Sequence, residues 1–280
     1  MTEGLSKHPR MAEITRLSLN QITVSHWSVS QAVEGCVRHG IPSIALWRHK
    51  IEEAGLAACV RHVKDAGLHV SSVCRGGMFP SPTEAGRQKN LEDNFRAVEE
   101  AAALEADSLV LVVGGGAEVG LVEARKMVAD GVAALVPYAR RHGVKLGLEP
   151  LHPMYAAERS VLVTIGQALE LASGFGPEEV GLVLDVFHIW WDPQVLTLIA
   201  GSRGRIYGFH VNDWLVPLPD LLLGRGMMGD GVIDNRMLRL AVDDAGYDGP
   251  IEVEIFNRVI WDNDPDQVLE QMVQRFRALV

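Results

Sequence analysis

Short apolar runs rich in β-branched residues alternate along this chain with longer segments in which hydrophobic positions recur at helical spacing. The short runs predict strands, and the longer segments predict helices. The predicted strands are Leu17–Val24, Ser43–Trp47, Val70–Cys74, Ser108–Val113, Lys145–Glu149, Gly181–Asp185, Ile206–His210 and Ile251–Glu254. The predicted helices are Ser28–His39, Ala54–Ala66, Leu91–Leu104, Glu123–His142, Ile165–Ser173, Val195–Ala200, Asn235–Ala245 and Asp264–Leu279. Because each strand is followed by a helix, the pattern predicts βα units and a parallel sheet.

The number of repeats decides between two parallel-sheet architectures. Gly40, Gly67, Gly143 and Gly246 stand just after predicted helices, where a left-handed residue is favoured, and no Gly-, Ser- or Pro-rich linker divides the series. Eight strands are many for an open doubly wound sheet, and no GxGxxG motif follows the first one. We therefore predict an α/β fold with a single (β/α)8 TIM barrel over residues 14–280. Residues 1–13 are polar and lack a period, which predicts an N-terminal tail or an oligomer arm.

Composition and charge restrict the possible partners. The chain has 280 residues, 48% of them hydrophobic and 22% charged, which suits a globular protein with a sizeable core. Its 26 Lys and Arg against 36 Asp and Glu give a net charge of −10 without a basic cluster, which disfavours nucleic acid and anionic membranes as partners. Cys36, Cys59 and Cys74 form no disulfide framework, and we see neither a signal peptide nor a membrane-spanning run. We expect a cytoplasmic protein with buried thiols.

Four of the later predicted strands end on an acid or a histidine, namely Glu149, Asp185, His210 and Glu254. In a (β/α)8 barrel the carboxyl ends of the strands meet at one rim, where active sites lie. Carboxylates and an imidazole that converge there repel or desolvate one another unless a cation joins them. We therefore predict one divalent metal ion, preferably Mn²⁺, with Mg²⁺, Co²⁺ or Zn²⁺ possible. The alternative is that each acid only caps the helix that follows it.

The segments around these four residues carry a family resemblance. They read EPLHP at 149–153, DVFH at 185–188, HVNDW at 210–214, GDGVID at 229–234 and EVEIFN at 252–257. Together they resemble the xylose-isomerase-like TIM barrel superfamily, in the branch called sugar phosphate isomerases/epimerases. The resemblance implies one divalent metal, often manganese, held by Glu149, Asp185, His210 and Glu254. In the ketose epimerases of this superfamily the two glutamates, here Glu149 and Glu254, also exchange a proton with the sugar carbon.

Three further residues are candidates for substrate binding. The resemblance implies that His188, three residues after Asp185, touches the substrate, and that Arg225 binds sugar oxygens. Trp47 ends a predicted strand, where an aromatic face suits a sugar ring or an aglycone. The competing interpretations are a packed histidine, a solvated loop arginine and a core tryptophan.

His152 marks a departure from the epimerase pattern. Those enzymes carry a second glutamate shortly after the first metal ligand, whereas the next acid in this chain is Glu158. His152 stands three residues after Glu149, between two prolines, which suits a general base or acid near neutral pH. The EPLHP segment also resembles the large subunit of bacterial C-glycoside deglycosidases, which act on 3-oxo-glycosides and pair with a small β-rich subunit. In those proteins a histidine of this type serves as base.

The favoured function is a metal-dependent enzyme that abstracts a proton next to the carbonyl of a sugar or keto-sugar, as isomerases and epimerases do. A metal-dependent lyase that cleaves 3-oxo-glycosides is the alternative, and a non-catalytic sugar-binding barrel is a third hypothesis. A three-metal endonuclease of the same superfamily needs further His and Asp ligands and a basic groove, which the charge of −10 disfavours. We also predict a homo-oligomer or a complex with a small second subunit.

Overall fold

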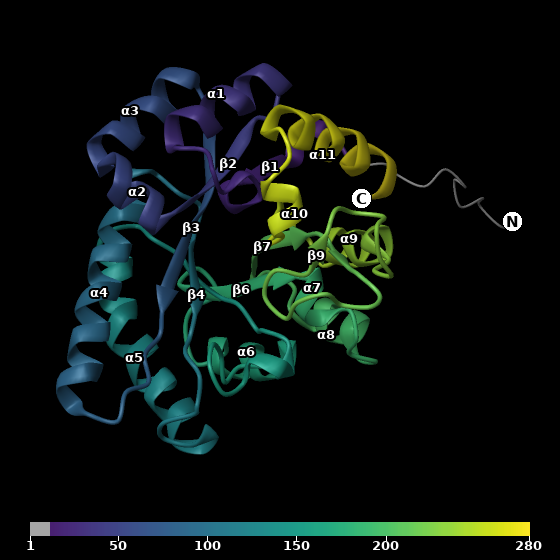
Figure 1. Ribbon diagram of the computed structural model, residues 1–280. Coiled ribbons are helices and arrows are strands. Elements are labelled where there is room, and N and C mark those ends of the chain that lie inside the picture. The colour runs from purple at the N-terminus through teal and green to yellow at the C-terminus, as the bar shows by residue number, and fades with distance from the viewer. Residues whose placement is uncertain (1–11) are drawn as a thin grey trace, which may run out of the picture.

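A closed barrel of parallel strands forms the centre of the molecule (Figure 1). The computed structural model describes residues 12–280, and within this range eight strands close in the order β1-β10-β7-β6-β5-β4-β3-β2. They are β1 (Leu17–Asn20), β2 (Ser43–Trp47), β3 (His69–Gly77), β4 (Leu109–Val112), β5 (Leu146–Leu148), β6 (Val180–Asp185), β7 (Ile206–Val211) and β10 (Ile251–Val253). Every neighbouring pair is parallel, so the predicted single (β/α)8 barrel is confirmed. Residues 1–11 of the predicted N-terminal arm lie outside the described residues.

Helices surround the barrel and connect its strands. They are α1 (Val29–His39), α2 (Arg48–Ala54), α3 (Leu56–Ala66), α4 (Glu84–Ala103), α5 (Leu121–Arg141), α6 (Ile165–Ala172), α7 (Val186–Ile189), α8 (Val195–Gly201), α9 (Asn235–Asp244), α10 (Arg258–Trp261) and α11 (Pro265–Leu279). Three 3-10 turns, η1 (Ile14–Arg16), η2 (Gln21–Val24) and η3 (Pro153–Tyr155), and a two-stranded ribbon of β8 (Asp213–Trp214) and β9 (Arg225–Gly226), complete the described elements. The last helix, α11, packs beside α1, so the two ends of the chain meet at the seam between β1 and β10 (Figure 1). Within residues 12–280 no helix combines the length and apolarity needed to cross a bilayer.

The helix boundaries follow from local capping. Ser28 and Gln31 form a capping box at the start of α1, and Gly40 ends this helix in the left-handed conformation at φ 64°. Gly67 ends α3 in the same way, with φ 65°. These ends agree with the glycines that the sequence indicated.

Two predicted elements are shorter or divided in the structure. The predicted strand Leu17–Val24 ends at Asn20, because the Asn20 side chain accepts a hydrogen bond from the Ile22 amide and turns the chain into η2. The predicted helix Ala54–Ala66 is interrupted at Gly55, whose φ of 81° separates α2 from α3. The apolar pattern is continuous through both places, so pattern alone misses these local turns.

Two other elements are longer than predicted. The strand β3 continues past Cys74 to Gly77, with a register shift between Cys74 and Gly76. The helix α4 begins at Glu84 instead of Leu91, because Thr83 caps it by accepting a hydrogen bond from the Gly86 amide. The first two turns of α4 are polar, which hid them from a reading based on hydrophobic spacing.

The barrel has an apolar outer face and a partly polar interior. Leu17 and Leu19 point outward into the main core, where the helices cover the strands. The alternating residues Ser18 and Asn20 point inward and are fully buried. Inside the barrel these polar side chains lie beneath the ends of the strands, where they contact the groups that carry the chemistry.

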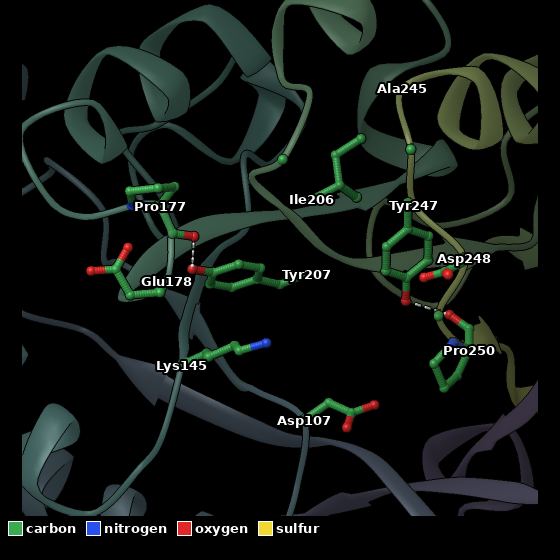
Figure 2. Close-up of a pocket in the computed structure, with 13 residues that line it drawn as sticks. Asp107, Lys145, Pro177, Glu178, Ile206, Tyr207, Ala245, Tyr247, Asp248 and Pro250 are labelled. Carbon is green, nitrogen blue, oxygen red and sulfur yellow. Dashed lines mark hydrogen bonds between the residues drawn. The ribbon is translucent and has the colours of Figure 1, made fainter.

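A cavity of about 510 Å³ opens at the amino-terminal end of the barrel, opposite the rim predicted to carry the site. Figure 2 shows the side chains of Tyr207, Tyr247, Lys145 and Asp107, which all line this cavity. The Tyr207 hydroxyl donates to the carbonyl of Pro177, and the Tyr247 hydroxyl donates to the carbonyl of Pro250 at 2.6 Å. The polar tips of both rings therefore have partners within the protein.

Candidate metal centre and active site

The four predicted metal ligands stand at the carboxyl ends of four neighbouring strands. Glu149 directly follows β5, Asp185 ends β6, His210 is in β7 and Glu254 directly follows β10. All four are buried, with exposures of 5% or less. One ligand atom from each residue lies within 4.8 Å of the others, so the structure brings the predicted set together.

Several polar atoms of this cluster have no hydrogen-bond partner. His210 directs Nδ1 toward the centre, 3.8 Å from Glu149 Oε1 and 3.6 Å from Glu254 Oε2. Both His210 Nδ1 and Glu149 Oε1 are buried without a hydrogen bond. Unsatisfied buried polar atoms are costly, and three carboxylates with one imidazole nitrogen are the donors that a hard or borderline divalent ion accepts. The residues therefore fit a divalent metal.

The electrostatics of the cluster point the same way. Burial and the charge of Glu254 raise the pKa of Glu149 to about 8. Burial lowers the pKa of His210, but the negative charges of Glu252 and Glu254 outweigh it and raise this pKa to about 10. Burial raises the pKa of Glu254, whereas the charge of Arg225 and the contacts with His210 lower it overall. The carboxylates thus compete for the positive charges available, and a cation would relieve that competition.

Arg225 is part of this cluster, and the alternative of a solvated loop arginine is wrong. The ribbon of β8 and β9 carries it inward, where it is only 4% exposed. Its Nη1 lies 2.6 Å from Asp185 Oδ2 and 2.7 Å from Glu254 Oε2. The guanidinium is held between the rings of Phe187 and Phe256, each 4.9 Å away. Arg225 therefore fixes two of the four carboxylates from one side.

His188, a predicted substrate contact, lies next to the Arg225 guanidinium. Its Nε2 is 3.2 Å from Arg225 Nη2, while its Nδ1 is buried without a partner. Burial lowers the pKa of His188 well below its usual value. The Tyr155 ring meets the imidazole edge-on at 5.7 Å. A neutral imidazole with a free nitrogen is thus available beside the metal ligands.

Trp47 reaches the same cluster through Asn20. Its Nε1 donates to Asn20 Oδ1 at 2.7 Å, and the Asn20 amide donates to Glu252 at 2.9 Å and to Glu254 at 3.2 Å. The Trp47 ring is partly buried and packs edge-on against Phe256 at 5.5 Å. The structure therefore places Trp47 at the rim beside the site.

Glu252 is a functional candidate to which the sequence reasoning gave no role. Its Oε2 lies 3.2 Å from His210 Nε2, and Ser71 donates to its Oε1 at 2.8 Å. This contact turns Nδ1 of His210 toward Glu149 and Glu254, as carboxylates do for metal-binding histidines. The available signal was alternation along the strand, because residues two apart face the same side and Glu254 was predicted to face the metal site.

His152 lies in the loop after β5, where it caps η3. Its Nδ1 accepts a hydrogen bond from the Met154 amide at 3.2 Å, and its ring packs against Trp191 at 5.5 Å and Trp214 at 5.1 Å. Burial lowers its pKa. A neutral imidazole whose Nδ1 accepts must carry its proton on Nε2, so His152 is set up as a hydrogen-bond donor.

Comparison with known families agrees with this fold. Residues 33–279 match the family described as xylose isomerase-like TIM barrel, and the chain belongs to that family. Among curated proteins it is similar to an inosose isomerase of Halalkalibacterium halodurans, with 25% identity over 261 residues that cover 86% of this chain and 88% of the relative.

Two solved structures are also similar. Protein SMc04130 from Sinorhizobium meliloti 1021 superposes with a TM-score of 0.93 and 45% identity, covering 95% of this chain and 99% of that one. The IOLI protein, solved with a bound zinc atom, gives a TM-score of 0.82 and 20% identity over 95% of this chain and 98% of that one. The second likeness bears on the fold alone.

Proposed function

We propose that this chain is a divalent-metal-dependent enzyme that moves a proton on the carbon next to the carbonyl of a sugar or keto-sugar, as isomerases and epimerases do. One observation carries the proposal: Glu149, Asp185, His210 and Glu254 converge within 4.8 Å, and the set includes buried atoms without partners. The similarity to an inosose isomerase supports this reaction type, and the zinc in the IOLI protein supports a divalent ion. We propose Mn²⁺ as the native ion, because oxygen donors dominate the set.

The protein groups have separate tasks in this reaction. A bound divalent ion polarises a carbonyl oxygen and makes the neighbouring C–H more acidic. Glu149 and Glu254 approach from different strands, so one carboxylate takes a proton from the substrate carbon while the other returns it. Arg225, which contacts Asp185, and the adjacent His188 hold substrate oxygens beside the carboxylates. His152 donates from Nε2 to an oxygen that gains negative charge.

A 3-oxo-glycoside lyase is the second candidate, and the position of His152 in the EPLHP segment favours it. Such a lyase needs His152 as a base. The hydrogen bond from the Met154 amide to Nδ1 leaves the proton on Nε2, so base catalysis requires a change of tautomer and loss of that bond. We therefore rank the isomerase or epimerase type first.

The test combines metal analysis with isotope exchange. The purified protein is analysed for bound metals and then incubated in deuterium oxide with Mn²⁺ and a panel of ketoses, an inosose and a 3-oxo-glucoside. We expect about one divalent ion per chain and deuterium incorporation next to the carbonyl of one substrate class. Release of an aglycone without exchange into recovered substrate would favour the lyase. A protein without metal affinity or exchange would refute both functions.

A further inference from the structure

A long loop connects the short strands β8 and β9 beside the proposed site. Residues 215–222 of this loop read LVPLPDLL, and two of their apolar side chains are largely exposed, Val216 at 71% and Leu221 at 59%. Within residues 12–280, no side chain of this segment joins the hydrophobic core, although Trp214 before it and Met227 after it both do. A segment with so few buried apolar contacts can open locally at a low cost in free energy.

The segment 215–222 is anchored at its ends and at one point between them. Its ends are held by the ribbon of β8 and β9 and by the pairing of Gly224 with Asn257. Among the described residues, one hydrogen bond joins the segment to another part of the chain, and in it the Tyr155 hydroxyl donates to the Leu221 carbonyl. The middle of the loop therefore depends on a single polar contact.

Tyr155 is the fixed partner in this contact. It belongs to η3, and its ring packs with Val112 and Leu151 and is only 7% exposed. Its carbonyl accepts hydrogen bonds from the amides of Arg159 at 2.9 Å and Glu158 at 3.1 Å. Because both the ring and the backbone of Tyr155 are held, its hydroxyl stays in one place. The movable partner of the hydrogen bond is therefore the loop.

The contact with Tyr155 carries the loop past the proposed site. The loop starts after β7, whereas Tyr155 follows β5, and the barrel order places β6 between these two strands. A loop that reaches from β7 to the segment after β5 passes the carboxyl end of β6, where Asp185 and His188 stand. The Tyr155 ring meets the His188 ring edge-on at 5.7 Å. The same residue thus contacts both the loop and a predicted substrate contact.

We infer that residues 215–222 are a lid over the mouth of the site, and that the Tyr155 hydroxyl is the latch that holds this lid closed. Tyr155 is a positioning residue in this role, because it acts through the lid and through His188. The inference deepens the proposed function, on which it rests, since a closed lid excludes water while a proton moves between a carboxylate and the substrate carbon. A latch of one hydrogen bond opens at a low cost, which lets substrate enter and product leave.

A tyrosine at the other end of the barrel makes the same kind of bond without this consequence. The Tyr207 hydroxyl donates to the Pro177 carbonyl. The segment around Pro177 is also held by Arg205, whose guanidinium donates to the Phe175 carbonyl at 2.9 Å. Loss of the Tyr207 hydroxyl therefore leaves its partner segment in place, so Tyr207→Phe is a matched control for Tyr155→Phe.

The first test asks whether the hydroxyl holds the lid. Wild type, Tyr155→Phe and Tyr207→Phe are digested with thermolysin, which cleaves before leucine, and fragments cut within residues 215–222 are measured by mass spectrometry. Loss of one hydrogen bond should raise the open population, and with it the rate of cleavage in the lid, by about five- to tenfold in Tyr155→Phe. Tyr207→Phe should be cut there at the wild-type rate. An unchanged rate in Tyr155→Phe would overturn the latch.

The second test asks whether the lid covers the site. Diethyl pyrocarbonate modifies neutral imidazoles that reach solvent, and His188 is only 3% exposed. We expect modification of His188 to accelerate in Tyr155→Phe along with cleavage of the lid, while the exposed His62 reacts equally fast in every protein. Faster cleavage of the lid without faster modification of His188 would show that the loop does not cover the site, and the lid assignment would be wrong.

Deuterium exchange separates this inference from the proposed function. With Mn²⁺ and 2-keto-myo-inositol, an inosose, as the probe, the latch predicts that KM rises by about five- to tenfold in Tyr155→Phe while kcat stays nearly unchanged, because the closed state is less populated. A lower kcat at unchanged KM would make the hydroxyl part of the chemistry and refute its role as a latch. If the wild type exchanges neither this inosose nor another ketose, the proposed function is refuted, whereas the cleavage and modification rates still decide whether the lid exists.

Discussion

The two ends of the barrel both contain charged and aromatic side chains, but they differ in whether the polar atoms of those side chains have hydrogen-bond partners. At the amino-terminal end, the Tyr207 and Tyr247 hydroxyls donate to carbonyls, and His69 Nε2 lies 2.6 Å from Asp107 Oδ2 (Figure 2). At the carboxyl end, Glu149 Oε1 and His210 Nδ1 are buried with no hydrogen bond.

This difference separates a structural surface from a functional one. A protein gains stability by satisfying buried polar groups, so the cavity tyrosines Tyr207 and Tyr247, whose hydroxyls have carbonyl partners, need no ligand to explain them. An end where several remain unsatisfied is less stable than the same fold could be, which is typical of sites that wait for a ligand. The cavity of about 510 Å³ at the amino-terminal end is therefore not by itself a sign of function.

The largest expected effect comes from Glu149→Gln, which tests whether the carboxyl end is built around an ion. The amide keeps the shape but removes a ligand and a proton carrier, so turnover should fall by more than about 10³-fold. Without metal, the variant should be more stable than the wild type above about pH 5, because the raised pKa of Glu149 means that its ionisation disfavours folding as pH rises. Melting curves with and without Mn²⁺ measure the stability of each protein and the shift in melting temperature that the ion causes. The matched control is Glu158→Gln, which changes an exposed acid of the same loop. A Mn²⁺-induced shift in melting temperature that persists in Glu149→Gln would contradict the ligand assignment.

His152→Ala tests the chemistry apart from the metal. Turnover should fall by about 10² to 10⁴-fold, the usual range for a positioned acid or base, while Mn²⁺ affinity stays unchanged. Steady-state rates and metal titration provide the two readings, and His62→Ala, on the exposed side of α3, is the control. Unchanged turnover would show that His152 only shapes the loop. Loss of metal would show that it is a ligand.

Glu252→Gln tests whether Glu252 orients His210 at the carboxyl end of the barrel. The amide side chain still reaches Ser71 and Asn20 but no longer places a negative charge 3.2 Å from His210 Nε2. Loss of such a contact lowers metal affinity by about 10 to 100-fold. Competitive titration of Mn²⁺ against a fluorescent chelator measures this affinity. Wild-type affinity in the variant would mean that the barrel wall alone orients His210.

The smallest effect is expected at the amino-terminal end, from His69→Gln. The hydrogen bond with Asp107 outweighs burial and raises the pKa of His69. The pair therefore stabilises the fold below about pH 6.5, and this contribution disappears as pH rises through the raised pKa. Because both side chains are substantially exposed, the loss should be at most about 1 kcal/mol. Denaturant unfolding at about pH 5 and about pH 9 measures this loss in the free energy of unfolding. Reduced turnover in this variant would show that the amino-terminal end also contributes to function.

The sequence predicted the fold, and it predicted that four side chains at strand ends converge, because both follow from periodic patterns. A polar residue that ends an apolar strand, such as Asp185, lies at the carboxyl rim of the barrel. The contacts of Arg225 and Glu252 could not be predicted in the same way. Arg225 enters from a long loop whose path depends on a two-residue ribbon, which no apolar pattern records.

The contacts of Asn20 determine when the site can form during synthesis of the chain. Its one amide group joins Trp47, from early in the chain, to Glu252 and Glu254 near the end, across the seam where the barrel closes. All four proposed metal ligands belong to the second half of the sequence, but two of the residues that support them, Asn20 and Ser71, come from the first. A chain that ends before β10 therefore lacks Glu254 and the partners of Asn20, so the proposed metal site is complete only after the last strand has docked.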